Sequence, residues 1–230
     1  MRNTRISLIG LIIASVFVLG AVAAATASAT TTMPELVNKE GKTPTKTEFK
    51  AKSGEGKFET KGKHLVTCKA DTATGKLTGP SSDESTITFT GCSTTVLITL
   101  KCNSEGAKEG EIILKVTSEL VWLNSGLTEP GEDLALPSAG LTIKCTSSET
   151  LKVKGSTVCP ISGYKVLSVK GTITCEQSKG VQKFTKYFLE GKEETDLTET
   201  EGTGLIKFAF EQSGLKSTDT LTYEEEVEII

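Results

Sequence analysis

The sequence predicts an all-β protein: an antiparallel β-sandwich or open barrel of about a dozen short strands, stapled by disulfides and preceded by a signal peptide. Three observations predict this class. Apolar and polar residues alternate with a period of two over many segments, and turn-forming residues separate those segments at short intervals. Six cysteines also occur in a chain that begins with an export signal.

The first 29 residues have the features of a signal peptide. Arg2 and Arg5 form a basic start, residues 6–25 are uncharged and mostly apolar, and the segment ends in "ASA", a small-x-small cleavage pattern. The alternative is an uncleaved membrane anchor, since about 20 apolar residues can span a bilayer. We expect cleavage because no basic stop-transfer cluster follows. The protein is therefore expected to be secreted, in the extracellular space or the cell envelope.

The rest of the chain has a suitable length for one all-β domain. Residues 30–56, rich in Thr, Lys and Gly, are expected to form an irregular N-terminal arm. Residues 57–230 are expected to form a single β-sandwich domain, because their periodic segments continue to the end without a linker-like interruption.

Alternation is clearest in residues 85–91, 166–175 and 221–229. Each of these strands should have one buried face and one wet face, as is usual in antiparallel sheets. The side chains expected on the buried faces are Ile87 and Phe89; Leu167, Val169, Ile173 and Cys175; and Leu221, Tyr223, Val227 and Ile229. The turn-forming stretches are residues 71–75, 79–84, 103–111, 124–126 and 160–164.

The charge of the chain after residue 29 limits its partners. This part has 24 lysines, no arginine and 29 acidic residues, a formal charge of −5. An acidic chain is disfavoured as a nucleic-acid binder. Guanidinium groups make the bidentate contacts that suit phosphate, and an ammonium group imitates them poorly. We therefore expect no nucleic-acid or phosphate partner.

The six cysteines are expected to form three disulfides, because an exported chain with an even number of cysteines is normally oxidised. The sequence alone does not determine the connectivity. Our expected pairs are Cys92–Cys102, Cys159–Cys175 and Cys68–Cys145. If residues 96–100 formed a straight strand, Cys102 would lie roughly 20 Å or more from Cys92. The first pair therefore requires this run to bend.

Catalytic and metal motifs are absent from the sequence. There is no GxSxG, HExxH, glycine-rich phosphate loop or EF-hand pattern. His64 is the only histidine, and zinc needs closely spaced Cys and His ligands. An exposed or packing role for His64 is the alternative to a role as catalytic base. We expect no enzyme activity, no catalytic residue, no metal and no cofactor.

Aromatic rings are the candidates for contact with a ligand, because they can present flat faces to sugars. Trp122 lies between two apolar residues, so packing in the core or at its rim is the alternative for this ring. Calcium prefers Asp-rich loops, and no loop stands out in this respect. The candidate rings are Trp122, Tyr164, Tyr187, Phe188 and Tyr223.

Several runs carry a resemblance to a known group of proteins. These runs are "CKADTATGKLTGP", "TITFTGC", "GAKEGEI", "EDLALPSAGLTIKC" and "FAFEQSGLKSTDTLTYEEEVEI". With them the chain resembles exported actinobacterial proteins of unassigned function. The resemblance implies secretion and a β-rich domain, with Cys68, Cys92, Cys102 and Cys145 as recurring cysteines and Cys159 and Cys175 as an additional pair. It implies no catalytic or ligand-binding residue.

Three functions remain open at this point. The first is an exported, non-catalytic surface or envelope protein that binds a glycan, a wall polymer or a protein partner. The second is a structural or matrix protein. The third is a glycoside hydrolase that uses two carboxylates on facing strands, which would leave no motif in the sequence.

Overall fold

The structure is a computed structural model that describes residues 33–95, 97–146, 149–204 and 207–230. The expected signal peptide lies outside these residues. Within them the regular elements are twenty strands and no helix, so the predicted all-β class is confirmed. The strands are β1 (Leu36–Asn38), β2 (Glu48–Ser53), β3 (Gly56–Thr60), β4 (Leu65–Cys68), β5 (Ala70–Leu77), β6 (Ser82–Thr90), β7 (Ser93–Thr95), β8 (Thr99–Lys101), β9 (Asn103–Ser104), β10 (Glu111–Trp122), β11 (Pro130–Ala135), β12 (Leu141–Thr146), β13 (Glu149–Pro160), β14 (Ser168–Cys175), β15 (Gln177–Ser178), β16 (Val181–Gln182), β17 (Lys186–Leu189), β18 (Lys192–Thr195), β19 (Thr198–Thr203) and β20 (Phe208–Ile229).

The strands pair in antiparallel ladders, as predicted. Eighteen of them belong to one continuous sheet, and β15 and β16 form a separate two-stranded sheet. The expectation of about a dozen short strands is wrong. The described residues form twenty strands, of which β10 and β13 have 12 residues each and β20 has 22.

Two of the twenty strands lie in residues 30–56, where the sequence suggested an irregular arm. β1 pairs with the C-terminal part of β20, and β2 lies between β5 and β20. In β2, Phe49 and Ala51 are buried while Lys50 and Lys52 are exposed. The expected arm is therefore wrong for these strands, because alternation over only six residues is enough to place β2 in the sheet.

Eight strands close into a ring around a first hydrophobic core. In order around the ring they are β14, β20, β2, β5, β6, β10, β11 and β13. The ring closes between β13 and β14, where Ile161 and Ile173 form an isolated bridge. We call this ring and its core lobe one. Its buried apolar residues are Leu36, Phe49, Ala51, Ala73, Leu77, Leu120, Cys159, Ile161, Ile173, Cys175, Leu221, Val227 and Ile229.

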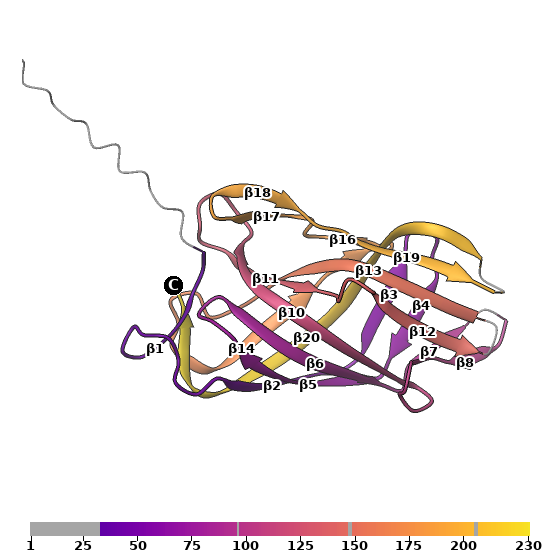
Figure 1. The fold of residues 1–230 in the computed structure, drawn as a ribbon, viewed down its shortest axis with the longest axis horizontal. Coiled ribbons are helices and arrows are strands. Elements are labelled where there is room, and N and C mark those ends of the chain that lie inside the picture. Colours follow the sequence, from indigo (N-terminus) through magenta and orange to yellow (C-terminus); the bar gives the residue numbers. More distant parts are fainter. Residues whose placement is uncertain (1–32, 96, 147–148, 205–206) are drawn as a thin grey trace, which may run out of the picture.

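A second ring encloses a second core, and we call it lobe two. Its order is β20, β3, β4, β7, β8, β9, β12, β13 and β19, where only Cys102 separates β8 from β9. Figure 1 shows an elongated molecule with β1 and the C-terminus at one end and β7, β8 and β12 at the other. The buried apolar residues of lobe two are Val66, Cys68, Phe89, Cys92, Cys102, Ile112, Ile143, Cys145, Leu151 and Val153.

The long strands β13 and β20 belong to both rings. β13 pairs with β12 and β19 as far as Gly155 and with β11 from Ser156 onward. Gly155 has a positive φ of 95°, and a Cβ atom there would lie 1.9 Å from the carbonyl oxygen of Leu197. Only glycine fits this crossing point, because other residues would be strained in backbone conformation and would clash. The two lobes are therefore parts of one continuous sheet.

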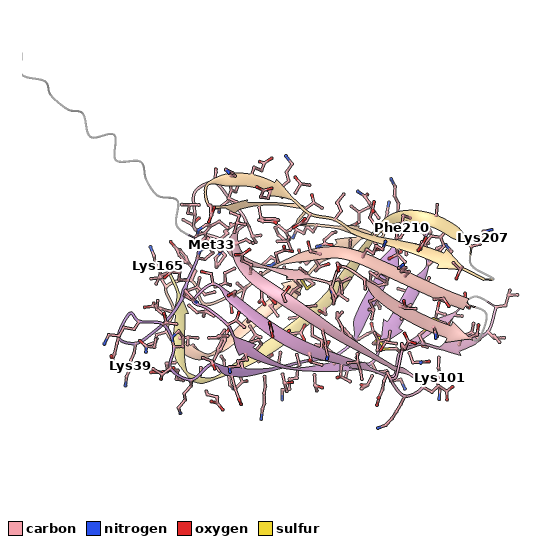
Figure 2. All side chains as sticks on the ribbon, in the orientation of Figure 1. Met33, Lys39, Lys101, Lys165, Lys207 and Phe210 are labelled. Atoms are coloured by element: carbon pink, nitrogen blue, oxygen red, sulfur yellow. A yellow bond between two sulfur atoms is a disulfide. The ribbon has the colours of Figure 1, made fainter. Side chains whose placement is uncertain are left out.

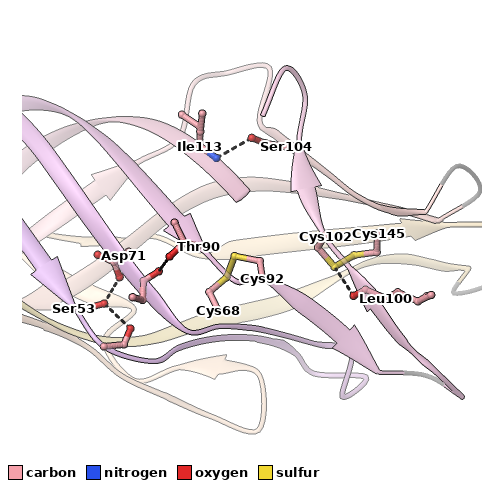
Figure 3. Close-up of a disulfide and its surroundings, with 12 residues drawn as sticks. Ser53, Cys68, Asp71, Thr90, Cys92, Leu100, Cys102, Ser104, Ile113 and Cys145 are labelled. Atoms are coloured by element: carbon pink, nitrogen blue, oxygen red, sulfur yellow. Dashed lines mark hydrogen bonds between the residues drawn. A yellow bond between two sulfur atoms is a disulfide. The ribbon is translucent and has the colours of Figure 1, made fainter. Parts of the chain in front are cut away.

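Three disulfides join the six cysteines, and one of the expected pairs is present, Cys159–Cys175. It links β13 to β14 at the closure of lobe one. The other two expected pairs, Cys92–Cys102 and Cys68–Cys145, are wrong. The structure instead pairs Cys68 with Cys92 and Cys102 with Cys145 (Figure 3).

The reason is the position of the hairpin β7–β8 between Cys92 and Cys102. The run does bend, and the Cys102 N–H donates to the Cys92 carbonyl oxygen at 3.0 Å. Each cysteine then bonds outward, to the strand on its other side: Cys92 to the end of β4 and Cys102 to β12. Three disulfides indicate an oxidising, extracellular environment.

The expected buried face of residues 166–175 is wrong in its first half. Leu167 and Val169 are each 40% exposed, whereas Ile173 and Cys175 are buried. Between Ser168 and Lys170 the register with β20 shifts: Ser168 pairs with Val227 and Lys170 with Thr222, so four residues of β20 lie opposite Val169. The regular ladder that places alternate β14 side chains in the core therefore begins only at Lys170. The other residues expected to face inward are buried or half-buried.

Candidate functional site

The aromatic residues suggested as ligand contacts do not form a row of exposed rings. Trp122 and Tyr187 are buried, with 5% and 7% of their surface exposed, and Tyr164, Phe188 and Tyr223 are half-buried. Tyr164 packs edge-to-face against Trp122, with 5.5 Å between the ring centroids. Trp122 and Tyr187 are therefore packed in the interior, as in the packing alternative for Trp122, whereas Tyr223 also lines an outer cleft of the protein.

His64 lies just before β4, and its ring stacks on Phe208 with 4.3 Å between centroids. The His64 ring is therefore used in packing, which was the alternative to a role as catalytic base. In the part of the chain that the structure describes, three or more Asp, Glu, His or Cys side chains do not gather anywhere in a metal-binding arrangement.

Pairs of carboxyl groups do come together inside lobe one, which bears on the hydrolase alternative. Asp71 on β5 lies beside Asp219 on β20, and Ser53 donates a hydrogen bond to Asp71. Burial, together with the hydrogen bond and the charge of Asp71, raises the pKa of Asp219 to about 8. The Ser217 hydroxyl donates to Asp219 Oδ2 at 3.0 Å. At neutral pH the Asp219 carboxyl group is therefore mostly protonated.

A second pair, Asp83 and Glu132, lies on β6 and β11. Burial is the main cause of the raised pKa of both groups, to about 6 for Asp83 and well above its usual value for Glu132. Their mutual repulsion raises the pKa of Glu132 further. The Ser118 hydroxyl donates to Asp83 Oδ1 at 3.2 Å.

A third pair, Asp133 and Asp196, lies beside β17. The Tyr187 hydroxyl donates to Asp196 Oδ2 at 2.6 Å. Burial raises the pKa of Asp133 to about 7, and the neighbouring Asp196 contributes to the shift. Burial and the hydrogen bond to Asp196 also raise the pKa of Tyr187.

The space around the interior carboxyl groups is too small for a substrate. Asp71, Glu132 and Asp219 line a cavity of about 40 Å³, together with apolar side chains such as Ile173 and Leu221. Pockets that bind small molecules usually measure about 300 Å³ or more. These pairs therefore offer hydrogen-bonded carboxyl groups but no room for a sugar ring.

A much larger cleft, of about 820 Å³, lies on the outer face of lobe one. It crosses five neighbouring strands, β20, β2, β5, β6 and β10. Strands in a sheet lie about 4.8 Å apart, so the cleft is roughly 19 Å long across the sheet. Pro137, which follows β11, also contributes to its lining.

Cross-strand register explains how these residues form two walls and a floor. The Lys/Thr wall is a row of directly paired residues, and the Glu wall is the next exposed row along the strands. Between them the backbone of the inward-facing row forms the floor. The Lys/Thr wall consists of Thr222, Lys50, Thr74, Thr86 and Lys115; the Glu wall of Glu224, Glu48, Lys76, Glu84 and Thr117; and the floor of Tyr223, Phe49, Gly75, Ser85 and Val116.

Gly75 has a structural role in this floor. The ring of Phe49 passes beneath it, and a Cβ atom at Gly75 would lie 2.2 Å from Phe49 Cζ. The absence of a side chain thus allows Phe49 to pack against Tyr223, with 6.0 Å between the two ring centroids. The floor is therefore supported from below by aromatic packing.

The cleft presents hydroxyl, ammonium and carboxylate groups to solvent. Lys50, Lys76 and Lys115 are exposed, and within the described residues none of the three forms an ion pair with a carboxylate. Such a surface can hydrogen-bond along an extended polar chain, but it contains no buried acid and base pair. Sequence reasoning did not identify this cleft. The alternating threonines are visible in the sequence, but the sequence does not show which strands lie next to one another.

We find no helix among the described residues with the length and apolarity needed to cross a bilayer. Comparison with known proteins gave no match to this chain from any family model, any curated protein or any solved structure.

Proposed function

We propose that this protein is an exported, non-catalytic binding protein that holds an extracellular polymer, a glycan or cell-wall polysaccharide, in the cleft on the outer face of lobe one. The cleft itself is the observation that carries the proposal. Its two walls place polar side chains at regular intervals across five strands. Export is supported by the three disulfides and the signal-like N-terminal sequence.

The shape of the cleft suits a chain more than a compact molecule. It is open to solvent along its length, and its walls repeat the same hydroxyl and charged groups from strand to strand. Each hydrogen bond to a solvent-exposed group contributes only about 0.5–1.5 kcal/mol net. Useful affinity therefore requires many contacts along a repeating partner, which a polysaccharide supplies.

The test is retention on cell-wall and polysaccharide fractions, with variants of one wall. The variant Lys50→Ala/Thr74→Ala/Thr86→Ala removes three paired side chains on β2, β5 and β6. A matched control, Lys144→Ala/Thr150→Ala/Thr203→Ala, removes the same residue types from a paired row on lobe two. We expect the cleft variant to lose about tenfold or more in affinity and the control to bind like the parent protein.

Two outcomes would overturn the proposal. If the parent protein is not retained on any fraction, a structural or matrix role would replace binding. A panel of glycosidase, esterase and peptidase assays covers the remaining alternative. Reproducible turnover that a single Glu→Gln or Asp→Asn change abolishes would identify a hydrolase.

A further inference from the structure

The outer face of lobe one carries a band without acidic side chains. The band has two adjacent rows, the first of which extends the Lys/Thr wall by one strand to β14. We call these two rows the lysine band. They are Lys170, Thr222, Lys50, Thr74, Thr86 and Lys115 in the first row, and Thr172, Thr220, Lys52, Thr72, Thr88 and Ile113 in the second.

The lysine band differs in charge from the protein that carries it. The whole chain has a formal net charge of −3, whereas the band has four lysines and no carboxylate. The four lysines, Lys50, Lys52, Lys115 and Lys170, are all exposed. Ion pairs among the described residues all lie elsewhere, as with Lys42–Glu40 and Lys186–Glu193. None of the four ammonium groups of the band therefore has a carboxylate partner at ion-pair distance, although the facing wall of the cleft carries Glu48, Glu84 and Glu224.

The spacing of the four lysines suits a linear partner. Strand spacing places Lys170 and Lys50 about 10 Å apart, and Lys50 and Lys115 about 14 Å apart, along the direction of the cleft. Lys52 lies about 7 Å from Lys50 along β2. A polymer that runs across the strands would therefore contact ammonium groups over roughly 20 Å of its length.

Because the cations of the band are lysines and not arginines, the band favours carboxylates over phosphates as partners. A lysine ammonium is a compact point charge, and the forked contacts that favour phosphate need arginine, which is absent after Arg5. Threonine hydroxyls between the lysines can donate to or accept from sugar hydroxyls. A carboxylated sugar chain offers both partners in alternation.

We infer that the lysine band selects an anionic polysaccharide whose sugar units carry carboxylates, a polyuronate in chemical class. This inference rests on the proposed function, because it identifies the class of polymer that occupies the same cleft. The carboxylates lie along the lysines of the first row, and the hydroxyls of the sugar chain lie on the threonines.

The experiment compares polygalacturonate with neutral dextran, by calorimetry or affinity electrophoresis, at low and high NaCl. We expect binding to polygalacturonate that weakens as salt screens the charges, and much weaker binding to dextran. The variant Lys50→Gln/Lys115→Gln/Lys170→Gln should lose about tenfold or more in affinity for polygalacturonate. Circular dichroism and thermal melting check that the variant is folded.

The control variant is Lys39→Gln/Lys108→Gln/Lys207→Gln, which changes net charge by the same amount at exposed sites outside the band. Figure 2 shows Lys39 and Lys207 near opposite ends of the molecule. We expect this variant to keep its affinity within about twofold. An equal loss in both variants would mean that overall charge, rather than the lysine band, determines binding, and would overturn the inference.

The remaining outcomes separate this inference from the proposed function. Salt-independent binding of both polymers, lost in Lys50→Ala/Thr74→Ala/Thr86→Ala but not in the triple Lys→Gln variant, would overturn the inference and leave the proposed function standing. Tighter binding to polyphosphate than to polygalacturonate would overturn the choice of carboxylate. No binding to any of the three polymers, nor to cell-wall fractions, would overturn both proposals.

Discussion

Lobes one and two are built from the same sheet but enclose different interiors. Lobe one contains the carboxyl pairs Asp71–Asp219 and Asp83–Glu132 among its apolar residues. Lobe two encloses a mostly apolar cavity of about 90 Å³ and holds two of the three disulfides. Alternation therefore determines which side chains point inward, but not whether the interior that they form is apolar or contains carboxyl groups.

Each lobe should lose several kcal/mol of stability when a disulfide that belongs to it is removed. The Cys102–Cys145 bond spans 43 residues and the Cys159–Cys175 bond spans 16. By loop-closure entropy, removing the first with Cys102→Ala/Cys145→Ala should cost about 4 kcal/mol, and removing the second with Cys159→Ala/Cys175→Ala about 3 kcal/mol. Urea unfolding measures both. A larger loss for the Cys159/Cys175 variant would show that ring closure in lobe one dominates stability.

The interior of lobe one should make stability depend on pH. Asp219 and Asp83 in this interior, and Asp133 beside β17, have pKa values raised to about 8, 6 and 7, above those of the unfolded chain. Such groups stabilise the fold fully below their unfolded pKa, and this stability is lost as pH rises through the folded pKa. The free energy of unfolding should therefore fall between pH 4 and pH 8, by up to about 1.4 kcal/mol per pH unit for each such group.

Asp219→Asn is the variant that isolates one of these groups. Asparagine cannot ionise, so the fall in unfolding free energy between pH 4 and pH 8 should be less steep than in the parent protein. Chemical unfolding at several pH values measures the slope. None of the aspartates in the described residues is exposed, so the control is Glu40→Gln, which changes a carboxylate in a surface ion pair. This control should leave the slope unchanged. An unchanged slope for Asp219→Asn would contradict the raised pKa.

The smallest effect is expected from filling the cavity of lobe two. Val153 lines this cavity, and Val153→Ile adds one methylene group toward it. Burial of that group should stabilise the protein by about 0.8 kcal/mol, which thermal melting can detect. Val227→Ile in the core of lobe one is the control, where an added methylene is expected to be neutral or destabilising. Equal stabilisation by both changes would remove this contrast between the lobes.

Local patterns predicted the local features of the fold. Leu221, Val227 and Ile229 are buried as their alternation requires, because side chains of a strand must point to opposite faces. The same rule failed at Leu167 and Val169, where extra residues of β20 interrupt the ladder, because the alternation within residues 166–175 contains no sign of them. The same alternation is present in β2, but lysines beside Phe49 and Ala51 make this short segment resemble an exposed one.

The disulfides and the cleft could not be predicted in the same way, because both depend on which strands become neighbours. Cys92 and Cys102 are close in space, yet each bonds to a strand that lies 24 or 43 residues away in the sequence. Similarly, Lys50, Thr74 and Thr86 become one wall only when β2, β5 and β6 pair in the observed register. A one-residue change in that register would turn these side chains inward.

β20, one of the two strands shared by both lobes, determines when the protein can complete its folding. β20 pairs with β2 and β14 in lobe one and with β3 and β19 in lobe two, and the ribosome makes it after all of these strands. Neither ring can close until the chain has been synthesised beyond residue 208, so most strands are made before β20, the strand that completes both rings. Contacts between residues so distant in sequence make folding slow. Until then the free edges of β2, β3, β14 and β19 are exposed, and this nascent state is the one most in need of protection from aggregation.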